Sequence, residues 1–280
     1  MFDAPRKNEL TQGTIFSCAY AENYNETSVY GITLTARCDA SQDKAPIYNF
    51  IPIVPLGDWI IHDGAEIVLK RAEADAANTK KNIILQAGLS ESLIRTKSSK
   101  EIIDGHLLPK ASTDKGLQKK LQQFKEQDQI IAEITAAISS DRSKITDTLK
   151  KFQKHIDTTI KELAGNRLTG YYLLRSMPSL YDDSGRDYVA LLREVHHIPR
   201  SLAQRIISGV SKTEWEAQPD RELTKCPVFY GDDDYCVPVA RLQSPWIEHL
   251  MQSWTLLFSR IGVEDIDASS VRKSLATLGI

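Results

Sequence analysis

Two stretches, Val29–Arg37 (VYGITLTAR) and Ile47–Val54 (IYNFIPIV), decide the fold, because both have the composition of short β-strands. Their β-branched and aromatic residues partly alternate with polar ones, which is typical of strands. The run Thr14–Phe16 predicts a further strand before them. Proline cannot donate a hydrogen bond to a sheet, so three prolines predict edges or bends in this region: Pro46, Pro52 and Pro55.

Extended runs return in the second half of the chain. Two pairs of them each surround an Asp-rich turn and predict hairpins: 171–177 with 188–195, and 226–230 with 235–242. A sheet of two or three strands is marginal in water, so we infer that neither half closes a core alone. We therefore predict an α+β fold in which residues 10–61 and 168–243 assemble one discontinuous antiparallel β barrel.

The segment between these halves is helical. Helix-forming residues dominate 65–87, 117–138 and 143–163, and apolar residues in the last of these recur every three or four positions, which places them on one helix face. A further helix is predicted after Ser244 and Pro245, which suit its first turn. The expected organisation is residues 1–63 as the first barrel half, 64–167 as a helical insertion, and 168–280 as the second half with a C-terminal helix.

Composition excludes several classes of protein. Lys and Arg number 35 against 37 Asp and Glu, so a uniformly basic nucleic-acid coat is excluded. No apolar run approaches the roughly 18 residues of a membrane span, and the start MFDAPRKNEL lacks the apolar core of a signal peptide. We therefore expect a cytoplasmic protein with no membrane partner.

Motifs for cofactors and metals are missing from the sequence. The four cysteines contain no C-x-x-C pair, so free thiols that pack as small apolar groups are expected. No nucleotide-binding glycine motif and no zinc-protease motif occurs either. The sequence predicts no cofactor and no metal.

Three runs stand in a familiar order: Gln12–Phe16 (QGTIF), Gly31–Thr35 (GITLT) and Phe50–Val54 (FIPIV). They resemble the opening of the PemK/MazF-like toxin family, whose fold is a small SH3-like β barrel with a C-terminal helix. The segment 244–262 (SPWIEHLMQSWTLLFSRIG) is similar to that helix. The resemblance implies an SH3-like barrel here, and the helical insertion has no counterpart in the compact toxins.

Members of that family are ribonucleases that cut single-stranded RNA, or inactive relatives used for binding. The family's catalytic Arg precedes the second strand and its Thr or Ser follows the third, but Tyr30 and Val54–Pro55 occupy those places here. The available residues are Arg37 and Thr35 at the far end of the second strand. Arg37 with Lys44 is a candidate phosphate or anion site, since Arg grips phosphate with two parallel hydrogen bonds. The alternative is an Arg37–Asp39 pair that fixes the loop.

His196 and His197 follow a predicted strand, with Glu194 nearby. A His at the mouth of a barrel can act as a general acid or base near neutral pH. Adjacent residues on a strand point to opposite faces, which argues against a shared metal site. His196 therefore joins Arg37 and Thr35 as a candidate catalytic residue, with a structural or surface role as the alternative.

The helical insertion carries many lysines, and Lys150, Lys151 and Lys154 are the candidate partner-binding residues. Plain packing of solvated helices and nucleic-acid binding are the alternatives. Two functions follow. The first is a PemK/MazF-like binding module of a bacterial toxin–antitoxin or phage-defence system, which docks a protein from the same operon or binds RNA or DNA. The second is a metal-independent endoribonuclease that cleaves single-stranded RNA. An adaptor without any nucleic-acid role is a third possibility.

Overall fold

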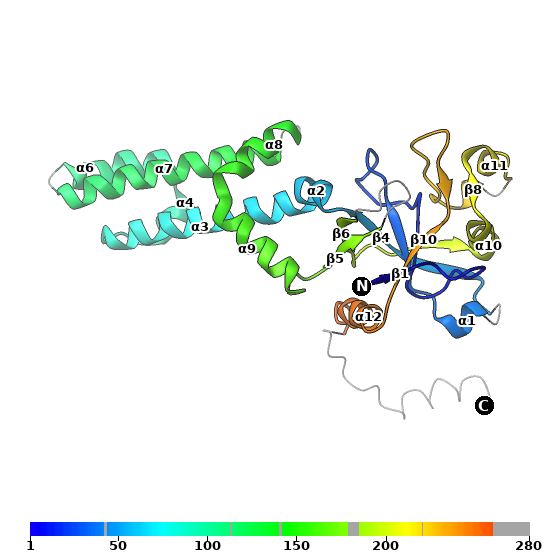
Figure 1. The fold of residues 1–280 in the computed structure, drawn as a ribbon. Coiled ribbons are helices and arrows are strands. Elements are labelled where there is room, and N and C mark those ends of the chain that lie inside the picture. The colour runs from blue at the N-terminus through cyan, green and yellow to red at the C-terminus, as the bar shows by residue number, and fades with distance from the viewer. Residues whose placement is uncertain (42–43, 113, 140–141, 179–184, 220, 260–280) are drawn as a thin grey trace, which may run out of the picture.

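The computed structural model describes residues 1–41, 44–112, 114–139, 142–178, 185–219 and 221–259. Its centre is an antiparallel sheet of eight described strands that curls into a nearly closed barrel (Figure 1). The strand order is β1 (Phe2–Asp3), β10 (Pro238–Leu242), β2 (Thr14–Phe16), β3 (Tyr30–Thr33), β4 (Ile47–Pro55), β6 (Arg186–Leu191) and β5 (Tyr171–Met177), and β7 (His196–Pro199) also pairs with β4. Strands from both halves of the chain thus share one sheet, in an α+β fold.

Strand β4 is central, and it contacts three other strands. Its whole middle pairs with β3, while Ile47–Phe50 pairs with β7 and Ile53–Pro55 pairs with β6. The prediction that Pro52 marks an edge or bend is wrong. Pro52 lies opposite Gly31, and the Leu34 amide bond to the Asn49 carbonyl shows that alternate positions are the bonded ones. Its missing N–H therefore faces the junction between β7 and β6, where no described strand needs it.

The two faces of the sheet bury two separate apolar clusters. One includes Phe16, Phe50, Val54 and Trp59. The other includes Ile15, Ile32, Ile51 and Leu250. The first is covered by α1 (Arg37–Ser41), α2 (Leu56–Trp59), α10 (Arg200–Ser208), α11 (Lys212–Glu216) and the two-stranded pair β8 (Val210–Ser211) with β9 (Tyr235–Cys236). The second is covered by α12 (Trp246–Thr255). A short helical turn, η4 (Arg221–Leu223), precedes the segment that leads to β9.

A helical arm lies between β4 and β5 and projects away from the barrel (Figure 1). Helices α3 (Ala65–Gln86) and α7 (Lys115–Ile138) lie side by side along it. A π-helical turn, η1 (Ile60–Gly64), joins α2 to α3 at its root. The shorter elements are α4 (Ser92–Thr96), α5 (Ser99–Ile102), η2 (Ile103–Leu107), α6 (Leu108–Ala111), α8 (Arg142–Leu149), η3 (Lys150–Phe152) and α9 (Gln153–Ala164).

Two apolar clusters stabilise the arm from within. The distal one surrounds Ile84 and Phe124, and the proximal one surrounds Val68 and Ile134. We call residues 80–125 the distal half of the arm, and residues 65–79 with 126–164 the proximal half. Lys80, a buried residue of α3 in the distal half, pairs with Asp128 of α7 just inside the proximal half. Its Nζ lies 2.5 Å from Asp128 Oδ1. Burial would raise the pKa of Asp128, but hydrogen bonds from Lys80 and Ser99 outweigh it and hold that pKa below its ordinary value.

The structure also corrects the predicted strand over 29–37 and the second predicted hairpin. The strand expected over Val29–Arg37 ends at Thr33, because Thr35 Oγ1 accepts the Asn49 amide and the Ala36 carbonyl opens the helical turn of α1. The second hairpin is wrong, because the Val228 amide binds the Cys18 carbonyl, while β9 pairs with β8 and β10 pairs with β2.

The helix expected over 143–163 is broken at Phe152, whose φ of −114° and ψ of 42° are not helical. Phe152 packs against the proximal cluster of the arm, between α8 and α9. The break lets the chain turn from the arm back toward β5. In the described ranges, no helix combines the length and the apolar character that crossing a membrane requires.

Gly31 allows the closest approach in the sheet. A Cβ at this position would lie 2.6 Å from the Phe16 ring and 2.9 Å from the Phe50 ring. We expect Gly31→Ala to lower the free energy of unfolding by about 1–3 kcal/mol, because overpacking forces core rings off their preferred rotamers. Gly57→Ala is the matched control, since a Cβ there meets no atom within 4 Å and Ala favours helix. Urea unfolding of both variants checks this, and equal midpoints for the two would contradict it.

Candidate functional site

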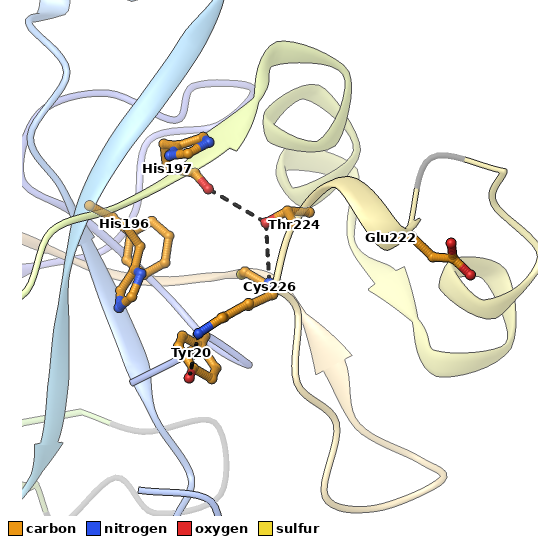
Figure 2. A pocket seen from close by; sticks show the side chains of 8 residues that line it. Tyr20, His196, His197, Glu222, Thr224 and Cys226 are labelled. Carbon is orange, nitrogen blue, oxygen red and sulfur yellow. Dashed lines mark hydrogen bonds between the residues drawn. The ribbon is translucent and has the colours of Figure 1, made fainter. Parts of the chain in front are cut away.

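An open pocket of about 300 Å³ lies beside the start of β7 (Figure 2). The chain segments that form it are the loop after β2, the middle of β4, the start of β7 and the segment after η4. Its lining residues are Tyr20, Phe50, His196, His197, Glu222, Thr224, Lys225 and Cys226. Residues far apart in sequence therefore converge on one hollow beside the sheet.

A carboxylate–imidazole pair forms the most ordered part of this pocket. A turn after β6, closed by the Glu194 amide on the Leu191 carbonyl, places Glu194 two residues before His196. Residues two apart in an extended chain share a face, and His196 Nε2 lies 2.7 Å from Glu194 Oε1. The same carboxylate accepts the Glu22 amide. With Glu194 ionised, Nε2 donates, and Nδ1 is left as the acceptor for a substrate proton.

Aromatic rings hold the His196 imidazole in place. The Tyr20 ring meets it edge-on at 5.0 Å, and the Phe50 ring lies 5.6 Å away. His197 lies on the other side of β7, and Figure 2 shows the two imidazoles pointing to different sides. The expectation that adjacent His residues serve opposite faces fits this arrangement. In the described part of the chain, no three His, Cys, Asp or Glu side chains are placed to hold a metal ion.

A cation lies at the mouth of the pocket. Lys225 Nζ is 3.1 Å from the Tyr20 hydroxyl, 3.3 Å from Glu22 Oε2 and 4.6 Å from the centre of the Tyr20 ring. Hydrogen bonds from Tyr20 and Lys225 hold the pKa of Glu22 below its ordinary value. Cys226 lines the pocket but is buried, and burial raises the pKa of its thiol. The site thus offers an ammonium and an imidazole, and no ready thiolate nucleophile.

The root of the arm adds a partly buried acid next to this site. Asp63 lies in η1, and burial raises the pKa of its carboxyl, although the Tyr24 and Tyr171 hydroxyls beside it act in the opposite direction. The Tyr24 hydroxyl is buried, and no described group meets it with hydrogen-bond geometry. The negative charge of Glu194 raises the pKa of Asp63 further.

The other predicted site residues lie elsewhere. Thr35, Arg37 and Lys44 do not line the pocket. Arg37 is exposed at the start of α1, and Thr35 binds the Asn49 amide, on the β3 side of β4, whereas His197 pairs with Asn49 from the β7 side. Two strand spacings, about 10 Å, therefore separate the Thr35 and β7 backbones. The grouping of Arg37 and Thr35 with His196 remains a prediction.

The predicted partner-binding lysines lie in the proximal half of the arm. Lys150 Nζ is 2.8 Å from Asp147, and Lys151 Nζ is 2.7 Å from Glu133, so both have partners within the arm. Lys154 is exposed on α9. Sequence reasoning missed Tyr20, Glu22 and Lys225, because nothing local connects positions 20 and 225. The Glu-x-His spacing at 194–196 was the one available signal.

The raised pKa of Asp63 gives a pH-dependent test. A raised folded-state pKa means that the protonated carboxyl stabilises the fold at low pH, and that this stability is lost as pH rises from the ordinary value of 3.8 through the folded-state value. Asp63→Asn does not titrate. We expect its free energy of unfolding, relative to that of the wild type, to rise between about pH 4 and pH 7. Urea unfolding at several pH values measures this.

Asp58→Asn is the matched control, an acid-to-amide change in the preceding helical turn. It should follow the wild-type pH dependence. An Asp63→Asn difference that is flat or falls with pH would show that Asp63 ionises as readily in the folded chain as in the unfolded one.

Comparison of the chain with protein-family models, with curated proteins and with solved structures finds no match. The function is therefore argued from the residues and the geometry of this molecule.

Proposed function

We propose that this protein is a binding module of a bacterial toxin–antitoxin or phage-defence system, in which an SH3-like, PemK/MazF-type barrel carries an arm that docks a protein from the same operon. The observation that carries the proposal is the independence of the arm. Both of its apolar clusters consist of arm residues alone. Only the root of the arm joins the barrel core, through Leu163 and Ile67. The rest reaches away from the barrel, which suits it to contact another molecule (Figure 1).

The family resemblance supports the barrel part of this proposal. The three resembling runs correspond to β2, β3 and β4, which are consecutive neighbours in the sheet. The C-terminal helix α12 packs on one face of that sheet through Leu250. This adjacency of the three strands and the packing of the C-terminal helix support the proposal of an SH3-like barrel.

The proximal half of the arm is the docking surface in this proposal. Ile138 and Ile160 keep 44% and 45% of their surface exposed there. Lys150, Lys151 and Lys154 lie in the same half. Exposed isoleucines gain most from a partner, because burying one apolar side chain contributes roughly 1.5–3 kcal/mol.

We expect the double change Ile138→Ser and Ile160→Ser to weaken partner binding at least tenfold, since loss of an interface anchor costs more than about 1 kcal/mol. Binding is measured by calorimetry with the purified products of the neighbouring genes. Leu85→Ser with Leu108→Ser is the matched control, because these leucines are equally exposed, at 49% and 50%, but lie in the distal half. No complex with wild type, or an equal effect of both pairs, would contradict the proposal.

A second function, metal-independent cleavage of single-stranded RNA, is favoured by the Glu194–His196 pair. His196 would take the proton from a ribose 2′-hydroxyl, whose oxygen attacks the adjacent phosphorus and displaces the 5′-oxygen, leaving a 2′,3′-cyclic phosphate. The 5′-oxygen would take a proton from water, and Lys225 would offset the charge on the phosphate. Arg37 and Thr35 would contribute only if bound RNA spans β4.

RNA cleavage in the presence of EDTA tests this second function. We expect His196→Ala to lower the rate by at least about 100-fold, the usual contribution of a general base, and His106→Ala, outside the pocket, to leave it unchanged. Arg37→Ala shows whether the α1 guanidinium takes part. Intact RNA after incubation with wild type, or full activity of His196→Ala, leaves the binding module as the function.

A further inference from the structure

The distal half of the arm concentrates positive charge. Residues 80–125 contain 10 Lys and Arg but only 4 Asp and Glu, whereas the rest of the chain contains 25 against 33. A protein with a formal net charge of −2 thus carries a segment of net charge +6 at the far end of its arm. Charge asymmetry of this kind marks the electrostatic footprint of a polyanion.

Several of the basic side chains in the distal half form ion pairs within the arm. Lys80 contacts Asp128, Lys81 and Arg95 contact Glu91, and Lys97 contacts Glu101. These pairs leave little free charge on α4, α5 and the facing part of α3.

Lys100 on α5 also has no ion pair among the described residues, but most of the unpaired positive charge lies on the first turns of α7. Four lysines there have no ion pair or hydrogen bond with any described side chain: Lys115, Lys119, Lys120 and Lys125. At 3.6 residues per turn, Lys115 and Lys119 lie on the side of α7 opposite the distal cluster. Leu121 and Phe124 turn into that cluster, and Lys120 and Lys125 flank them on either side. At a rise of 1.5 Å per residue, Lys115 and Lys125 are about 15 Å apart along the axis, a length over which a duplex presents several phosphates.

The chemistry of this surface favours phosphates over an acidic protein. Its cations are lysines, which bind phosphate as point charges, and Lys is depleted at protein interfaces, where Trp, Tyr and Arg form the anchors. Phe124 is the one aromatic residue in 80–125, and it is buried. The exposed residues between the lysines are Gln118, Gln122 and Gln123, which supply further neutral donors.

We propose that α7 of the distal half, through Lys115, Lys119, Lys120 and Lys125, binds the phosphate backbone of nucleic acid without reading its sequence. This goes beyond the proposed function, because it uses the opposite end of the arm from the protein-docking surface. With no aromatic side chain to stack on bases and no arginine fork in the surface, affinity comes from charge neutralisation and the release of counterions.

The test measures binding of fluorescein-labelled 20-base-pair DNA of random sequence to the full-length protein by anisotropy. Neutralising four phosphates predicts a slope of about −3.6 in log K against log salt, and therefore roughly a 100-fold loss of affinity between 50 and 200 mM salt. The variant with Lys115, Lys119, Lys120 and Lys125 all changed to Gln should bind at least tenfold more weakly at 50 mM, with a slope near zero.

The matched control removes the same charge elsewhere and leaves the candidate partner-binding lysines in place, with the exposed residues Lys7, Lys70, Lys161 and Arg167 changed to Gln. It should bind DNA as the wild type does, and circular dichroism checks that both variants keep their helices. No binding by wild type at 50 mM salt, or equal losses in the two variants, overturns the proposal. Competition by polyglutamate at equal charge, or tighter binding to phosphatidylserine vesicles than to DNA, overturns it in favour of an acidic protein or a lipid surface.

These outcomes are separate from those of the proposed function. The protein-docking surface is tested with the isoleucine pair and a protein partner, and the lysine variants leave Ile138 and Ile160 in place. DNA binding without a protein complex, or a complex without DNA binding, identifies which of the two ideas has failed.

Discussion

The pairing of β4 with strands from the other half of the chain is the constraint on which the rest of the structure depends. Ile47–Phe50 binds β7 and Ile53–Pro55 binds β6, so one nine-residue strand holds together segments more than 130 residues apart. Pro52 is tolerated at its middle because its nitrogen faces the gap where one partner ends and the next begins. Gly31, on β3, lets Phe16 and Phe50 meet edge-on at 5.2 Å behind it.

This pairing determines how the arm is attached. The chain leaves the sheet at the end of β4 and must return at the start of β5, so α3 and α9 are brought together at the root. Arg71 on α3 binds Glu162 at 2.5 Å and Thr159 at 3.0 Å on α9, which fixes that meeting point. Beyond it the arm has no barrel surface to bury against. Its helices therefore need their own clusters, and the long-range Lys80–Asp128 pair adds to the distal one.

Local patterns predicted the elements that depend on local chemistry. The β-branched runs predicted β2, β3 and β4, and the first predicted hairpin is β5 with β6. Helix-forming composition predicted α3 and α7, and the Ser244–Pro245 start predicted α12. Predictions failed where a distant partner overrides a local preference. Cys226–Tyr230 has strand composition, yet its backbone binds the Cys18 segment. The apolar periodicity over 143–163 continues without interruption through the Phe152 break. The pocket was beyond local reasoning, since Tyr20, Glu194 and Lys225 meet only in the folded sheet.

The loop between β2 and β3 contacts both the pocket and the root of the arm. Tyr20 and Glu22 in this loop contact His196, Glu194 and Lys225 in the pocket. Two residues later, the Tyr24 ring stacks on His62 in η1 at 4.4 Å, next to Asp63. Glu194 therefore acts on both places: it orients His196 through a hydrogen bond, and its charge raises the pKa of Asp63. The Glu194 carboxylate interacts with both His196 and Asp63, so the ionisation of Asp63 and the Glu194–His196 pair are electrostatically linked. The arm is therefore joined to the barrel beside the candidate site.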